Sequence, residues 1–191
     1  MESTTREIMN IQKIDEILRL PDDLEQRVEQ RRKDAFVGSY EHIKGRFHRL
    51  PIVSGWTTYS KGLKGCGAII AVKYKLPMIS TDVVPDDLVD FALEHESVES
   101  ALDLTASDKD HPIAFGKSKE LGITKSINTS NVKWNHVFAT VRQLRLAQKH
   151  NKLDEMMKFA DAIESKPENS VSGYGNKELR QAVYQLLNSA V

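Results

Sequence analysis

The sequence predicts a mainly α-helical, α+β fold, with a helical bundle in the C-terminal half and a small central β-hairpin. Apolar residues recur every three or four positions at both ends of the chain, which is typical of amphipathic helices. The centre is instead rich in β-branched and aromatic residues around a glycine-rich stretch, which is typical of strands joined by a turn. The 191 residues contain no convincing linker, so we expect a single domain spanning 1–191.

Helices are expected over residues 4–47. Thr4 and Glu7 form a capping-box pattern at the start of this region. Isoleucines follow at helical spacing, and Pro21 ends the first helix and begins the next. Apolar residues then continue the same spacing as far as Phe47. The sequence therefore predicts helix throughout this region, interrupted only near the proline.

A β-hairpin is expected over about residues 51–76. Its two strands would be 51–59 and 66–74, and residues 60–65 would form the turn. An isolated hairpin is only marginally stable in water. We therefore expect these strands to pack against the helices.

The remaining region, residues 82–191, is expected to be helical. Pro85 begins a helix, and residues 113–127 give no clear pattern. Residues 128–131 offer several N-terminal caps for a strongly periodic helix that ends near His150. Two further periodic segments follow, and their short connections favour antiparallel neighbours.

Charge is unevenly distributed along a chain whose formal net charge is zero. Residues 28–77 carry a net charge of +7, residues 78–111 a net charge of −9, and residues 112–159 a net charge of +6. Such segregation indicates either separate basic and acidic surfaces, used for nucleic acid or head-to-tail association, or segments that neutralise one another inside one fold. Both interpretations remain open at this point.

Basic residues are interleaved with aromatic residues in the two positive segments, a combination that single-stranded nucleic-acid binders use to hold phosphates and stack bases. The alternative is that the aromatic residues form the core and the cations surround it. Recognised RNA-binding motifs and zinc fingers are missing from the sequence. The candidate nucleic-acid-binding residues are Arg31, Arg32, Lys33, Lys44, Arg46, Arg49, Lys61, Lys64, Arg142, Arg145 and Lys149.

The sequence predicts no catalytic residues, no metal site and no cofactor. Its single cysteine, Cys66, has no histidine near it in sequence, and the six histidines lack the spacings of common metal motifs. Glu94 and Glu96 flank His95, but adjacent helical residues point to different sides. A reactive Cys66 and a metal held by scattered ligands are the less favoured alternatives.

Three functional classes follow, in order of preference. The first is a non-enzymatic assembly or nucleic-acid-associated protein of viral or phage structural or regulatory type, which also self-associates. The second is an adaptor or inhibitor that presents the acidic segment 82–110 to a basic protein partner. The third is a small enzyme whose site forms only in the fold.

The sequence also predicts a cytoplasmic location, or the host cytoplasm for a viral protein. The lone cysteine argues against a disulfide framework, and the polar, acidic N-terminus is unlike a secretory signal. No apolar run approaches the roughly 20 residues that span a bilayer, so no membrane span is expected.

Overall fold

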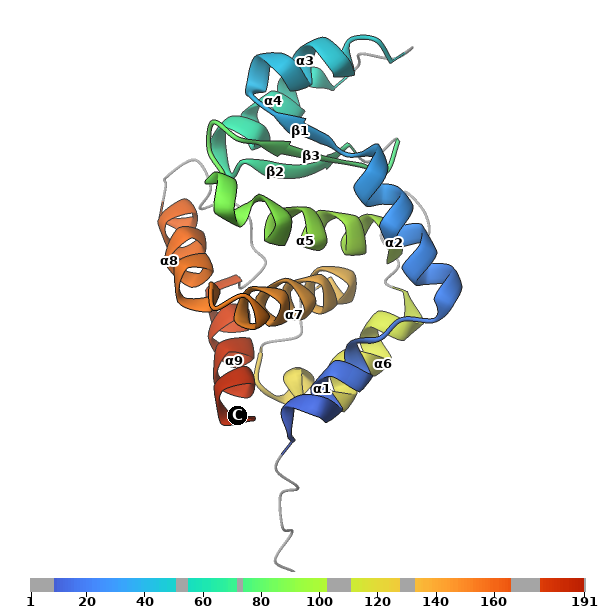
Figure 1. The fold of residues 1–191 in the computed structure, drawn as a ribbon, viewed down its shortest axis with the longest axis vertical. Helices are drawn as coiled ribbons and strands as arrows, with labels where there is room; N and C mark the ends of the chain where they lie inside the picture. The colour runs from blue at the N-terminus through green and yellow to red at the C-terminus, as the bar shows by residue number, and fades with distance from the viewer. Residues whose placement is uncertain are drawn as a thin grey trace, which may run out of the picture.

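The chain folds into helices stacked on both faces of a small β-sheet (Figure 1). The structure is a computed structural model, and within its described residues the fold is mainly α-helical with one three-stranded sheet, as the sequence predicts. The described residues are 9–50, 55–71, 74–102, 111–127, 133–165 and 176–190.

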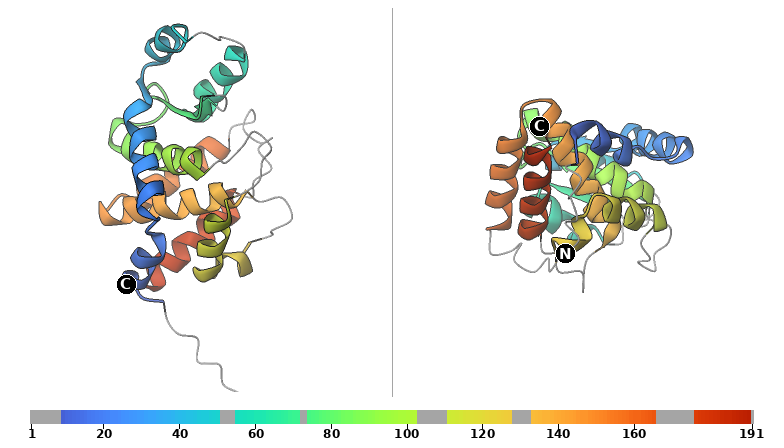
Figure 2. Two further views of the ribbon diagram at one scale, coloured as in Figure 1. Left: turned by 90° about the vertical axis from the view of Figure 1, so that its right-hand side faces the viewer. Right: turned by 90° about the horizontal axis from the view of Figure 1, so that it is seen from below.

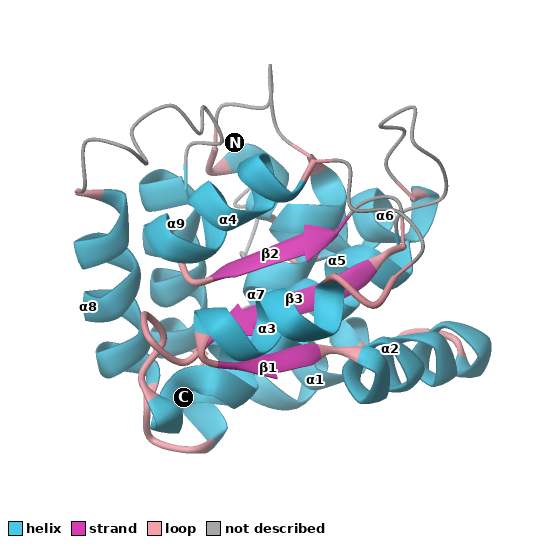
Figure 3. Cartoon of the chain, turned by 90° about the horizontal axis from the view of Figure 1, so that it is seen from above, coloured by secondary structure: helices cyan, strands magenta, loops and turns pink. Residues whose placement is uncertain are grey.

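The sheet has the strand order β1-β3-β2 (Figure 3). Strand β3 (Leu76–Ser80) lies in the middle, parallel to β1 (Phe36–Gly38) and antiparallel to β2 (Ala68–Ala71). Successive side chains of a strand point to opposite faces. Met78 accordingly packs into one hydrophobic core and Ile79 into another, so the sheet separates two cores.

The smaller core lies between the sheet and two helices at one end of the molecule (Figure 1). These helices are α3 (Tyr40–Phe47) and α4 (Trp56–Gly65). Phe47 and Leu63 are fully buried there, and partly buried aromatic rings surround them. We call this part of the molecule, β1 with α3 and α4, the sheet end.

The larger core lies on the other face of the sheet and contains most of the helices. Helix α5 (Val89–Leu102), which follows a short 3-10 turn η1 (Asp86–Leu88), covers this face, and α7 packs beneath α5 (Figures 1 and 2). Among the described helices, none combines the length and the apolar character that crossing a bilayer requires. The other elements are α1 (Ile11–Leu18), α2 (Asp22–Asp34), α6 (Pro112–Glu120), η2 (Ile123–Lys125), α7 (Trp134–Lys149), α8 (Leu153–Glu164) and α9 (Asn176–Ser189).

Helix α5 is the central layer, because the sheet covers one side of it and α7 the other (Figure 1). Nine of its residues are buried, and they lie on all sides of the helix. Glu94 and His95 are among them, although ionisable side chains are seldom buried without a partner. Glu94 contacts Arg32 and Arg142, and His95 contacts Glu99, His136 and Gln143.

The expected strand over residues 51–59 is not found in the described part of that segment, since residues from Trp56 onward form α4. Gly55 has a left-handed φ of 95° and precedes the helix. Trp56, Tyr59 and Leu63 recur at helical spacing and pack into the smaller core, which explains the helix. Residues 51–54 lie outside the described residues. The predicted pairing of 51–59 with 66–74 is therefore wrong: residues 60–65 belong to α4, and β2 pairs antiparallel with β3.

Two other boundaries differ from the prediction. Strand β1 interrupts the helix expected through residue 47, where Gly38 adopts a φ of 150° and Phe36 is buried in the smaller core. Helix α1 begins at Ile11, after Asn10 accepts a hydrogen bond from the backbone of Lys13. The predicted caps at residues 4–7 and 128–131 lie outside the described residues.

Candidate metal centre

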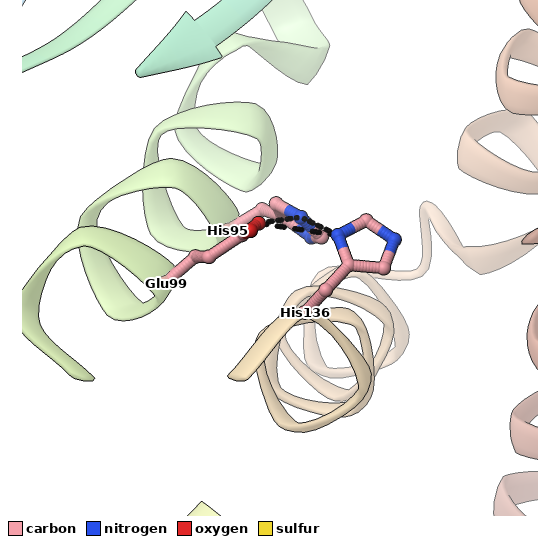
Figure 4. Close-up of side chains that lie close together, drawn as sticks. All are labelled: His95, Glu99 and His136. Carbon is pink, nitrogen blue, oxygen red and sulfur yellow. Dashed lines mark hydrogen bonds and ion pairs between the residues drawn. The ribbon is translucent and has the colours of Figure 1, made fainter. Parts of the chain in front are cut away.

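Two histidines and one glutamate converge between α5 and α7 (Figure 4). His95 and Glu99 are four residues apart on α5, so they share one side of that helix. His136 lies in the first turn of α7, which packs against α5. We call His95, Glu99 and His136 the donor cluster.

One atom of each side chain faces the other two. Nε2 of His95 lies 3.2 Å from Oε2 of Glu99 and 3.0 Å from Nδ1 of His136. Nδ1 of His136 lies 3.1 Å from the same Glu99 oxygen. The three atoms therefore form a nearly equilateral triangle, with every side at hydrogen-bond distance.

Hydrogen bonds within the triangle cannot satisfy all three of its atoms. The other ring nitrogen of His95, Nδ1, lies 3.2 Å from Oε1 of Gln143, which can only accept a hydrogen bond. Nδ1 of neutral His95 therefore carries the hydrogen, and Nε2 presents a lone pair. Nδ1–H of His136 then remains as the single donor of the triangle, and it leaves the lone pairs of His95 and Glu99 facing each other.

Burial opposes the simplest remedy, which is a second proton on His95. Desolvation lowers the pKa of His95, with a further contribution from His136, and it outweighs the attraction of Glu99. Burial acts to raise the pKa of Glu99, but the charges and hydrogen bonds of His136 and His95 together exceed it and hold the pKa of this carboxyl well below its usual range. The cluster thus favours an anionic Glu99 carboxylate beside a neutral His95 imidazole, and metals bind these two side chains in those protonation states.

Glu96 provides a second carboxyl group on the same helix. Burial, and then the negative charge of Glu99, raise the pKa of Glu96 well above its usual range. The two carboxyl groups consequently differ strongly in acidity although they are three residues apart. Glu99 remains the ionised member of the pair.

Two imidazole nitrogens and one carboxylate oxygen suit Zn²⁺, Fe²⁺, Co²⁺ and related ions, whereas Ca²⁺ and Mg²⁺ prefer oxygen donors throughout. Gln143 supplies the outer hydrogen bond that commonly fixes the orientation of a metal-binding histidine. Donors about 3.1 Å apart, each about 2.1 Å from a common ion, subtend angles of about 95° at that ion. That arrangement corresponds to one triangular face of an octahedron.

The predicted basic residues of α7 lie in ion pairs. Arg142 contacts carboxylate oxygens of Glu25 and Glu94, both at 2.8 Å. Arg145 and Lys149 both contact Asp15, at 2.8 and 3.1 Å. Here the oppositely charged segments neutralise one another within the fold, which is the alternative left open above.

The predicted cluster on α2 is also partly paired. Arg32 contacts Glu94 at 3.3 Å, and Lys33 contacts Glu29 at 3.4 Å on the same helix. Arg31 is partly buried. These cations lie at the end of α2 nearest the sheet, and Arg32 is joined to Arg142 of α7 through the Glu94 carboxylate that both contact.

The other five predicted cations lie at the sheet end. Arg46, Arg49, Lys61 and Lys64 are exposed, and Lys44 lies 3.8 Å from Glu41. The guanidinium of Arg46 lies 4.8 Å from the ring centre of Phe36, and the ammonium of Lys64 lies 4.4 Å from that of Tyr40. Beside α3 a hollow of about 440 Å³ is lined by Glu41, His42, Gly45, Arg46 and Arg49.

The acidic segment is also engaged where it is described. Asp87 lies 2.9 Å from Lys152, and Glu94 contacts Arg142 and Arg32. Residues 103–110 of this segment lie outside the described residues. Cys66 is partly buried, and its sulfur lies 3.1 Å from the carbonyl oxygen of Gly62.

The donor cluster was not predicted. Motif spacings search for ligands that are close in sequence, and His136 is 41 positions beyond His95. The pair His95 and Glu99, four residues apart on a helix, is the one local signal that could have found two of the three ligands. The neighbours Glu94 and His95 both contact side chains of α7, Glu94 through Arg142 and His95 through His136 and Gln143.

Comparison of the chain with protein-family models, curated proteins and solved structures finds no match. Side-chain chemistry therefore carries the functional argument.

Proposed function

We propose that this protein binds a divalent first-row transition-metal ion between α5 and α7, through Nε2 of His95, Oε2 of Glu99 and Nδ1 of His136. The observation that carries the proposal is the triangle of donor atoms, with sides of 3.0, 3.1 and 3.2 Å. A single cation that displaces the hydrogen from Nδ1 of His136 would accept a lone pair from each of the three atoms, including the two that otherwise face each other. The outer hydrogen bond to Gln143 and the partial burial of the cluster also support it.

Metal titration of protein purified in chelator tests the proposal. Calorimetry with Zn²⁺, followed by elemental analysis after gel filtration, should give one ion per chain. The nearly isosteric change Glu99→Gln removes the anionic ligand and should abolish stoichiometric binding. His48→Gln is the matched control, because His48 is exposed at the sheet end. Equal binding by wild type and Glu99→Gln would contradict the proposal.

A second candidate function is the binding of single-stranded nucleic acid by the sheet end. It is supported by four exposed cations: Arg46 on α3, Arg49 in the turn that follows α3, and Lys61 and Lys64 on the neighbouring α4. The aromatic rings of this region weaken it, because Trp56 and Tyr59 pack against Phe47, at centroid distances of 5.0 and 5.5 Å. These rings therefore belong largely to the smaller core, leaving phosphate contacts as the main source of affinity.

Fluorescence anisotropy with labelled single-stranded RNA and DNA across a salt series tests this second function. Four phosphate contacts predict that log K falls by about 2.8 per unit of log salt. The double change Arg49→Glu and Lys61→Glu should remove binding, while Arg145→Glu, in the internally paired set, serves as a comparison. Binding with an affinity that does not change with salt concentration would exclude a phosphate-contacting surface at the sheet end.

A further inference from the structure

The donor cluster supplies fewer ligands than a first-row ion takes. Within the described residues, three donor atoms converge on one point. Zn²⁺ takes four ligands in structural sites, and octahedral ions take six. A metal bound there would therefore have at least one coordination position that these side chains do not fill.

The number of remaining positions follows from the geometry of the ion. An octahedral ion that takes three donors on one face keeps three mutually adjacent positions on the opposite face. A tetrahedral Zn²⁺ keeps one position, and expansion to five-coordination adds a neighbouring one. The donor separations of 3.0, 3.1 and 3.2 Å are hydrogen-bond lengths that suit either geometry, and in both cases two neighbouring positions can take an exogenous ligand.

The net charge of the metal complex and the exposure of its ligands indicate what occupies the remaining coordination positions. A divalent ion with two neutral imidazoles and one carboxylate retains a net charge of +1, which favours an anion as the next ligand. The side chains of Glu99 and His136 are each 22% exposed, so the cluster is at the rim of the α5–α7 interface. Catalytic metal sites retain such an open position, whereas structural sites are closed by four protein ligands.

We infer that the metal ion bound by His95, Glu99 and His136 takes a small anion that chelates it through two adjacent oxygen atoms. This inference rests on the metal-binding function proposed above and adds the chemical class of the exogenous ligand. Two neighbouring open positions fit the two oxygens of a hydroxamate or a 2-oxo carboxylate in a five-membered chelate ring. Water fills these positions until the anion displaces it.

The test uses Co²⁺, whose visible spectrum reports its coordination, and acetohydroxamate as the chelating anion. Adding acetohydroxamate to the Co²⁺-loaded full-length protein should change the visible spectrum and saturate at one anion per cobalt. Azide, which binds through a single atom, should give a separate and weaker titration. Gel filtration of the mixture should recover the cobalt with the protein, which distinguishes a ternary complex from removal of the metal.

The outcomes separate the two proposals. Stoichiometric cobalt binding with a spectrum that acetohydroxamate does not alter would overturn the open-position inference and leave the metal-binding proposal standing. Recovery of all cobalt as free hydroxamate complex would overturn it in the same way. Failure of the protein to bind cobalt at all, or equal binding by Glu99→Gln, would overturn both. The spectrum of His48→Gln should follow that of wild type throughout.

Discussion

Two flanks of the α5–α7 interface solve the problem of buried polar groups in different ways. On one flank, which we call the paired flank, Arg142 lies between Glu25 and Glu94, so opposite charges compensate one another. On the other flank, the donor cluster brings together three groups that all act as bases. The comparison teaches that packing completes the paired flank from within the chain, whereas the metal ion proposed above would complete the donor cluster from outside it.

Loss of Arg142 should have the largest effect on stability. Arg142→Met leaves Glu94, which is 8% exposed, with Arg32 as its remaining cation. Breaking a buried ion pair by removing one partner costs about 3 kcal/mol or more. Urea denaturation should show that loss, and Glu94→Leu in the same chain should recover most of it. If Arg142→Met lowers the unfolding free energy by no more than a substitution at an exposed position does, water and not the protein compensates the charges of the paired flank.

Loss of the charge of Glu99 should not lower the stability of the metal-free protein, unlike loss of the charge of Arg142. In the absence of metal, Glu99→Gln should leave the protein as stable as wild type or slightly more stable, because the amide can donate to Nε2 of His95. At a Zn²⁺ concentration 100 times Kd, wild type should gain about 2.7 kcal/mol of unfolding free energy and the variant none. Thermal denaturation with and without Zn²⁺ measures both values. Destabilisation of the metal-free variant by several kcal/mol would make this flank a structural network like the other.

The outer hydrogen bond should affect metal affinity by an intermediate amount. Gln143→Leu removes the acceptor that holds Nδ1–H of His95, so Zn²⁺ affinity should fall about tenfold or more. Gln143→Glu retains an acceptor and should bind at least as tightly as wild type. Competition calorimetry measures these affinities. Identical affinity in all three proteins would remove Gln143 from the site.

The smallest expected effect is the pH dependence of the ion pair that joins α1 to α7. Hydrogen bonds from Arg145, opposed by burial, lower the pKa of Asp15. Since the folded-state pKa lies below the unfolded value of about 3.9, the stabilisation is present above about pH 5 and is lost as the pH falls through the folded-state value. Asp15→Asn should cost less than about 1 kcal/mol at pH 7, because Asp15 is 35% exposed. Its stability should converge with that of wild type at pH values below the folded-state pKa of Asp15.

The sequence predicts the helices more successfully than the sheet. Leu153, Met156 and Ile163 belong to a periodic stripe that α8 confirms. In contrast, the periodicity gave no sign of β1, because three residues are too few to establish an alternation. The aromatic residues at the start of α4 resemble a strand in composition, and only their helical spacing distinguishes them.

The candidate site was less predictable, for a geometric reason. Arg145 and Lys149, four residues apart on α7, both contact Asp15 of α1, and their spacing in the sequence does not say whether they face solvent or another helix. The donor cluster depends on how α5 crosses α7, which brings His136 to His95. That crossing is a property of tertiary packing, and no local pattern in this chain encodes it.

The sequence distance within the donor cluster has a consequence for the mechanics of the fold. Glu99 and His136 are 37 positions apart, so an ion shared by them would close a long loop as a reversible cross-link. With one cysteine, the chain has no intramolecular disulfide to serve this purpose. The central pair of helices would then be locked or released by the supply of an ion, and its resistance to being pulled apart would follow metal concentration instead of redox potential.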